Sequence, residues 1–275
     1  MNRFNLFCGI VLMVLNSSCV EHHEKPVVGG GFGIGESTNG LKEGEWKFYY
    51  EKNQPKSEGL FEKDTAEGDW IFYHKNGVVA EESFWKDGLL DGDYKLYWKN
   101  GKLREKGTFV QDRQYGYWEY FSNQGNIQAE GEFDNGFKQG EWKFWYANGQ
   151  LEAVNHFRDS LPHGQLVEYY EDGQLKTKGQ YRFGKQDSVW RQWYNNGNLK
   201  AELNWNNGKK HGLSTTFFRN GKKNSGANYL YGLEHGPSIW YYSNGQVQSE
   251  GNYHEGMMHG VFNYFYENGS VQEVR

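Results

Sequence analysis

Aromatic and polar residues alternate along most of this chain, and the alternation returns in phase every 24 residues. Counted from an opening residue at position 0, a unit usually has Trp or Tyr at position 2, Phe or Tyr at position 4 and Gly at position 9. Such a period indicates a repeat array in which each unit contacts mainly its neighbours. The opening residues are Gly44, Gly68, Gly92, Gly116, Gly140, Gly164, Ser188, Gly212, Gly236 and Gly260.

Each unit is predicted to form two antiparallel strands. Asn at position 8 and Gly at position 9 lie between two alternating runs, and we expect both turn residues to have positive φ. A second turn, such as Asp87-Gly88, follows at positions 19 and 20 and joins one unit to the next. No stretch has helical periodicity. The predicted fold is all-β: an elongated antiparallel meander of about ten stacked β-hairpin repeats of 24 residues, covering residues 40–275.

The turn at positions 8 and 9 predicts which residues face each other. Position 6 should face 11, position 5 should face 12, position 4 should face 13, position 2 should face 15 and position 0 should face 17. One side of the sheet then gathers aromatic rings, which we expect to cover one another as the sheet twists. Rings are also expected to lie over glycines in the same hairpin: Trp46 over Gly59, Tyr94 over Gly107 and Trp118 over Gly131.

Position 5 is aromatic in every unit, although it lies on the otherwise polar face. The ten rings could form a ladder that contacts sugars, peptides or a partner protein. Alternatively, the long side chain at position 12 covers each ring, as Lys56 would cover Tyr49. We favour the structural role, and the two roles are compatible. The ten residues are Tyr49, Tyr73, Tyr97, Phe121, Trp145, Tyr169, Trp193, Phe217, Tyr241 and Phe265.

The N-terminus differs from the array. Residues 1–18 are predicted to be a signal peptide, because the apolar run from Leu6 to Leu15 is too short to span a bilayer. The stretch LNSSC resembles a bacterial lipoprotein signal, which implies lipid attachment at Cys19; cleavage without lipidation is the alternative. Residues 19–39 would then be a lipidated cysteine and a flexible tether. Since Val20 is not an aspartate, the outer membrane is favoured over the inner one.

Composition narrows the possible functions. The net charge is −5 and the sequence contains no basic stripe, so nucleic acid is not expected as a partner. Beyond Cys19 there is no cysteine, so no disulfide or thiolate metal site can form there. The 18% aromatic content indicates a folded chain despite its polarity.

Histidines and carboxylates recur in columns, but neither pattern predicts catalysis or metal binding. Equivalent positions of adjacent units are two strands apart, roughly 10 Å, whereas one zinc ion requires ligands about 2 Å away. We therefore expect turn-flanking roles, no metal and no cofactor. The acidic column at position 14 lacks the single asymmetric pair that glycoside cleavage requires, so no enzyme is expected. Glu119 faces Glu130 without an evident reason. The histidines are His163, His211, His235 and His259, with His22 and His23 in the tether.

The repeat resembles the MORN repeat, and more closely the bacterial MORN-variant repeats of proteins labelled antitoxins. The resemblance is carried by Gly140 to Gly149, followed by Leu175, Gly179 and Tyr181 in the next unit, and it extends from Gly40 to the C-terminus. It implies an array of β-hairpins that holds partners or membranes without catalytic residues. Our first hypothesis is a lipid-anchored scaffold of the bacterial cell envelope with an unidentified protein partner. The alternatives are an antitoxin or immunity-like protein and a glycan binder that uses the position-5 rings.

Overall fold

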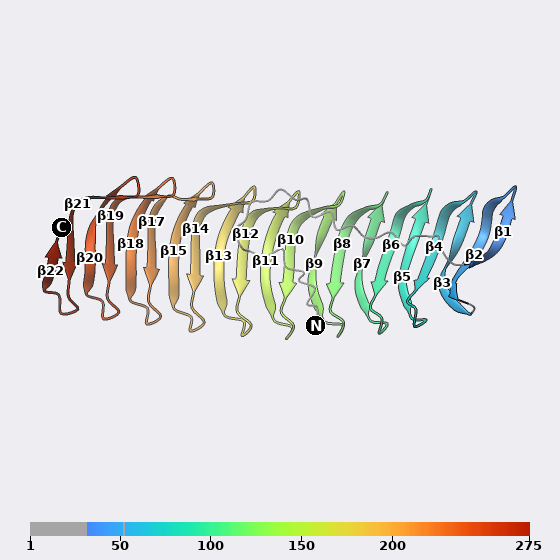
Figure 1. Cartoon of the computed structure of the whole chain (residues 1–275), viewed down its shortest axis with the longest axis horizontal. Helices are drawn as coiled ribbons and strands as arrows, with labels where there is room; N and C mark the ends of the chain where they lie inside the picture. Colours follow the sequence, from blue (N-terminus) through green and yellow to red (C-terminus); the bar gives the residue numbers. More distant parts are fainter. Residues whose placement is uncertain (1–31, 52) are drawn as a thin grey trace.

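The computed structural model describes residues 32–51 and 53–275, which form one antiparallel sheet of 22 strands. Strands follow one another along the sheet in chain order, as Figure 1 shows. The described part of the chain contains no helix, and hence none able to cross a membrane. The predicted all-β meander is therefore confirmed. Cys19, His22 and His23 lie outside the described residues.

Two strands form each repeat unit. The strands are β1 (Phe32–Thr38), β2 (Leu41–Glu51), β3 (Gln54–Glu62), β4 (Thr65–Tyr73), β5 (Val79–Lys86), β6 (Leu89–Tyr97), β7 (Leu103–Val110), β8 (Arg113–Phe121), β9 (Ile127–Asp134), β10 (Phe137–Trp145), β11 (Leu151–Arg158), β12 (Leu161–Tyr169), β13 (Leu175–Arg182), β14 (Lys185–Trp193), β15 (Leu199–Asn206), β16 (Lys209–Lys210), β17 (Gly212–Phe217), β18 (Lys223–Leu230), β19 (Leu233–Tyr241), β20 (Val247–His254), β21 (Met257–Phe265) and β22 (Val271–Val274).

The sheet begins earlier than the repeat pattern suggests. Strand β1 lies within the segment that was expected to be a tether, and it pairs antiparallel with β2. Gly35 is opposite Trp46, and a Cβ built on Gly35 would meet the Trp46 ring at 2.5 Å. Residues 32–38 therefore serve as the second strand of an incomplete unit ahead of the first full one.

The turn at positions 8 and 9 differs from the prediction. In the unit opened by Gly140, the Gly149 N–H donates to the Tyr146 carbonyl (3.0 Å) and the Tyr146 N–H donates to the Gln150 carbonyl (2.9 Å). Gly149 has φ of 85°, whereas Asn148 is not among the residues with positive φ. This geometry is a type I turn closed by a left-handed glycine, and not the two-residue turn in which both residues are left-handed.

The asparagine at position 8 is selected by hydrogen bonding. Asn148 Oδ1 accepts from the Gln150 N–H (2.9 Å), and its Nδ2 donates to the Glu171 carbonyl in the next unit (3.0 Å). Asn76, Asn100, Asn196, Asn220 and Asn244 make the same donation to the unit that follows each of them. One side chain therefore shapes its own turn and fastens that turn to its neighbour.

The second turn has the two-residue geometry that the sequence suggested for the first. Asp87 and Gly88 have φ of 51° and 76°. Two consecutive residues of positive φ define the type I′ turn, whose twist matches that of the strands it joins. Asp159 and Ser160 adopt the same conformation at φ of 52° and 61° without any glycine.

Pairing within a unit follows the prediction at one end of the hairpin and departs from it near the turn. Gly140, Trp142 and Phe144 face Phe157, Asn155 and Ala153, which confirms the 0–17, 2–15 and 4–13 pairs. The register then shifts, so that Trp145 at position 5 faces Leu151 at position 11. The expected 6–11 and 5–12 pairs are wrong because the left-handed glycine adds a bulge residue to the second strand.

A bulge between units explains the opening glycine. Glu132 faces Gln139 and Glu130 faces Lys143, so three residues on β10 oppose one residue on β9. Gly140 lies in this bulge with φ of 62°, and a Cβ added to it would meet nothing within 4 Å. Backbone conformation, rather than lack of space, therefore selects glycine at position 0.

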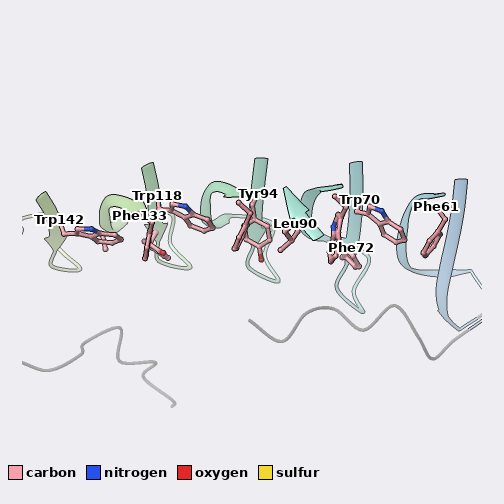
Figure 2. Close-up of a cluster of buried hydrophobic side chains, with 12 residues drawn as sticks. Phe61, Trp70, Phe72, Leu90, Tyr94, Trp118, Phe133 and Trp142 are labelled. Carbon is pink, nitrogen blue, oxygen red and sulfur yellow. The ribbon is translucent and has the colours of Figure 1, made fainter. Parts of the chain in front are cut away.

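Aromatic rings cover one face of the sheet and one another. The Phe133 and Trp142 rings pack edge to face, with centroids 5.0 Å apart at 84°, and Figure 2 shows them in a row of such rings along the array. Trp118 in the same row has 0% of its surface exposed. The expectation that neighbouring rings cover one another is confirmed.

The ring over each glycine at position 15 comes from the next unit. A Cβ on Gly131 would lie 2.3 Å from Trp142 Cδ2, although Trp118 is its partner across the hairpin. Likewise, Trp70 covers Gly59 and Trp118 covers Gly107. The expected cover by a ring of the same hairpin is thus wrong. The bulge at position 0 carries each tryptophan onto the preceding unit, so this contact joins units together.

Candidate interaction surface

We call the face opposite the buried rings the outer face; it carries positions 1, 3, 5, 14 and 16. The position-5 rings lie on it, and each is half-buried rather than exposed. Each faces the residue at position 11 of its own unit. The ten rings are Tyr49, Tyr73, Tyr97, Phe121, Trp145, Tyr169, Trp193, Phe217, Tyr241 and Phe265.

Two of the position-5 tyrosines, Tyr73 and Tyr97, bind carboxylates of the preceding unit. The Tyr73 hydroxyl donates to Glu58 Oε1 (2.5 Å), while Lys47 Nζ lies 3.1 Å from Glu58 Oε2. The Tyr97 hydroxyl donates to Glu82 Oε2 in the same way (2.9 Å). A cation at position 3, a carboxylate at position 14 and the next unit's phenol therefore form a three-part chain across the outer face.

These hydrogen bonds and the burial of the phenols shift the pKa values of the groups involved. Burial raises the pKa of Tyr73 to about 12, and the hydrogen bond to Glu58 acts in the same direction. The Tyr73 hydroxyl in turn holds the pKa of Glu58 below its usual value, with a further contribution from Lys47. Burial and the hydrogen bond to Glu82 also raise the pKa of Tyr97 to about 12. Each phenol thus stays a hydrogen-bond donor at neutral pH.

Cations at position 12 do not cover the position-5 rings as predicted. Lys56 lies over Tyr50, with Nζ 6.0 Å from the ring centroid, and the Arg104 guanidinium lies 5.0 Å from the centroid of the Trp98 ring. Both rings belong to position 6, one residue beyond the expected target. The register shift at the turn causes the change.

The position-6 side chains also fasten adjacent units. The Tyr170 hydroxyl donates to the Trp193 carbonyl (2.7 Å), and Trp98 Nε1 donates to the Phe121 carbonyl (3.1 Å). Tyr50, Tyr146, Tyr194 and Tyr242 make the same bond to the position-5 carbonyl of the unit that follows. The backbone carbonyl of many position-5 residues is therefore hydrogen-bonded to a side chain of the preceding unit, which limits the movement of the ring.

The facing carboxylates of Glu119 and Glu130 have an explanation in the neighbouring hairpins. The two residues are opposite each other, as predicted. Lys106 Nζ lies 2.5 Å from Glu119 Oε2, and Lys143 Nζ lies 3.8 Å from Glu130 Oε1. Each carboxylate has a cation from the strand on its other side. Pairing between hairpins thus relieves the repulsion within one hairpin.

The histidine column flanks turns. His163 Nδ1 accepts from the Phe183 N–H (3.3 Å), in the position where Glu67 Oε1 accepts from the Asp87 N–H (2.6 Å). His254 lies between His235 and His259, with ring centroids 4.9 and 5.8 Å away. Within residues 32–51 and 53–275, no group of three or more His, Cys, Asp or Glu side chains could hold a metal ion.

Two buried carboxyl groups were not predicted from the sequence. Glu81 and Glu105 occupy position 13 on the aromatic face and both are buried, whereas the other units have small residues there apart from the exposed Glu273. The Ser83 and Tyr94 hydroxyls donate to Glu81 at 2.8 and 3.3 Å. Burial nevertheless raises the pKa of Glu81. The departure from Ala, Ser or Thr at this position was the available signal.

The family model for the MORN repeat variant matches residues 42–63, 66–87, 90–111, 138–159, 162–182, 186–207, 234–255 and 258–274. No curated protein matches.

Among solved structures, a complex of TcdB2 and TccC3 with Cdc42 is similar over 84% of this chain at 13% identity, with a TM-score of 0.21. The Photorhabdus luminescens Tc holotoxin pore is similar over 84% at 13% identity, with a TM-score of 0.22. The match covers 15% of each of those chains. Such low scores carry no argument about function.

Proposed function

Because this chain belongs to the MORN repeat variant family, whose repeats generally mediate interactions with proteins or membranes, we propose that it is a non-enzymatic scaffold of the bacterial cell envelope. On this proposal a lipid on Cys19 anchors it, the outer membrane is its site, and the outer face binds a protein partner.

The observation that carries the proposal is the repeated construction of the outer face. The position-5 rings are half-buried, and two of them, Tyr73 and Tyr97, are also fixed through Glu58 and Glu82 to the preceding unit. The position-6 bonds hold the adjacent backbone from one unit to the next. A surface whose side chains are already ordered loses little conformational entropy on binding, which favours an extended partner.

Photocrosslinking in intact cells tests the partner. A photoreactive phenylalanine analogue at Trp145, on the outer face, should capture one defined protein. The same analogue at the exposed turn residue Asp172 is the control, because that site lies off the outer face. Equal capture of the same proteins at both sites, or no capture at Trp145, Tyr169 and Trp193, would contradict the proposed surface.

The anchor is tested separately. Cells that express the protein are labelled with a clickable fatty acid, and Cys19→Ala is compared with the unaltered chain. We expect the label and the membrane association to be lost together. Full incorporation of the fatty acid into Cys19→Ala would rule out the anchor but leave the interaction surface standing.

A further inference from the structure

The outer face changes its chemistry toward the C-terminal end of the array. In earlier units a cation and a carboxylate at positions 3 and 14 bridge neighbouring strands over this face. The bridges are Lys47–Glu58 (3.1 Å), Lys95–Glu82 (3.4 Å), Lys106–Glu119 (2.5 Å), Lys143–Glu130 (3.8 Å) and Arg191–Glu202 (2.7 Å).

Position 3 is uncharged in the three consecutive units opened by Gly212, Gly236 and Gly260, whereas earlier units lack a charge there only singly, at Ile71 and Val167; Glu250 remains at position 14. Thr215, Ile239 and Asn263 occupy position 3, and Gly226 occupies position 14 of the unit opened by Gly212. An open hollow of about 430 Å³ lies there, lined by residues of β17 to β21. These strands are the orange to red ones in Figure 1. Its size lies within the roughly 300–1,000 Å³ of small-molecule sites.

The hollow has an apolar floor. Leu213 and Val261, both at position 1, expose 51% and 60% of their surfaces, and Ile239 lies between their strands. In earlier units position 1 is mostly acidic, as at Glu45 and Asp69. From Val189 onward position 1 is apolar in four consecutive units, so the apolar floor belongs to the C-terminal part of the array, although Tyr117 also exposes a ring at this position.

Amide groups surround this floor. Asn228 Nδ2 donates to the Pro237 carbonyl (3.1 Å), and Asn263 Nδ2 donates to Glu250 Oε1 (3.2 Å). These bonds fix the orientation of two amides that still have further donor and acceptor capacity. Asn252 lines the same hollow. Oriented amides beside apolar carbon suit a ligand that has hydroxyl groups and C–H faces together.

The charges of the hollow indicate a neutral ligand. Lys223 and Glu250 both line it, so one cation and one carboxylate balance each other. Tyr241, the position-5 ring of the middle unit, also contributes to the lining. A basic peptide would meet Lys223, and an acidic one would meet Glu250. A neutral ligand would be repelled by neither residue.

We propose that this hollow binds a neutral saccharide. Its C–H face would pack on Leu213, Ile239 and Val261 and against the Tyr241 ring. Its hydroxyl groups would exchange hydrogen bonds with the asparagines and with Glu250. The site differs from the ladder of ten rings considered from the sequence, because only one position-5 ring takes part. It also stands apart from the scaffold proposal, since neither the anchor nor a protein partner is needed for it.

Gly226→Glu is the decisive substitution, because it restores the residue type found at position 14 of other units. A Cβ on Gly226 would lie 3.7 Å from Ile239 Cγ2, an ordinary contact, so the fold should tolerate a side chain that fills the hollow. Val154→Glu is the matched control. It introduces the same residue at the same repeat position, three units away from the hollow.

Isothermal titration calorimetry with cellohexaose, chitohexaose and maltohexaose measures the binding. At least one should bind the unaltered protein, with affinity reduced at least tenfold in Gly226→Glu and changed less than twofold in Val154→Glu. Asn252→Ala, which leaves the floor intact, should also weaken binding. Absence of heat with all three sugars at millimolar concentration, or equal affinity of Gly226→Glu and the unaltered chain, would overturn the proposal. Preferential binding of a lysine-rich peptide over every sugar would overturn it as well.

Discussion

Ser188 is the one opening residue that is not glycine, and it provides a quantitative test of the bulge geometry. It has φ of 61°, in the same left-handed region as Gly140 at 62°. An L-residue costs roughly 1–2 kcal/mol in this region. Glycine instead costs about 0.5–1 kcal/mol through the freedom of its unfolded chain. Since the Ser188 hydroxyl makes only an exposed bond to adjacent Asp187 (3.3 Å), Ser188→Gly should stabilise the protein by about 0.5–1 kcal/mol.

Urea unfolding followed by tryptophan fluorescence measures this change, and amide hydrogen exchange in β13 and β14 localises it. The local measurement is needed because repeat arrays can open unit by unit. Gly140→Ser is the reciprocal variant and should destabilise its unit by a similar amount, since no atom lies near the missing Cβ. Loss of stability in Ser188→Gly, together with an unchanged Gly140→Ser, would refute the role assigned to positive φ.

Further predictions concern the contacts between units and the titrating groups. Gly131→Ala should lower the free energy of unfolding by about 1–3 kcal/mol, because its Cβ would overlap Trp142; calorimetric melting tests this, and an unchanged melting temperature would contradict the ring contact. Tyr170→Phe should destabilise the joint between its unit and the next by about 0.5–1.5 kcal/mol, seen as faster exchange in β14 and no change in β4. Because the pKa of Tyr73 is raised to about 12, the folded state retains this proton where the unfolded chain loses it, so stability should fall as pH rises from 10 to 12. That fall should be smaller in Tyr73→Phe. The raised pKa of Glu81 likewise lowers stability as pH rises above the ordinary glutamate range, so Glu81→Gln should melt higher than the unaltered chain at pH 8, with a smaller difference at pH 4.

The fold was predictable because the repeat supplies the same evidence many times. The pairing of Gly140 with Phe157 and of Trp142 with Asn155 follows from the period and the alternation of faces. The register near the turn was not predictable from Asn-Gly alone. That dipeptide suits both a type I′ turn and a type I turn closed by a left-handed glycine, and these differ by one residue in the pairing.

Contacts between units were harder to predict than contacts within a hairpin. The cover of Gly131 by Trp142 depends on a bulge that adds residues at Gly140, and no single unit reveals that bulge. The hollow on the outer face was not predicted, for a related reason. Its lining combines three consecutive units, and Gly226 is notable only when compared with the glutamates at position 14 elsewhere.

The hydrogen bonds that the side chains at positions 6 and 8 make to backbone carbonyls of the neighbouring unit all run in one direction. The Asn148 amide and the Tyr146 hydroxyl donate to Glu171 and Tyr169, and the equivalent residues of other units likewise donate toward the C-terminus. Removal of one complete 24-residue segment would bring an equivalent acceptor to every donor, whereas removal of 23 residues would misplace the acceptors of the donors whose bonds span the deletion. Chain length in such an array can therefore vary in whole steps without redesign of any joint.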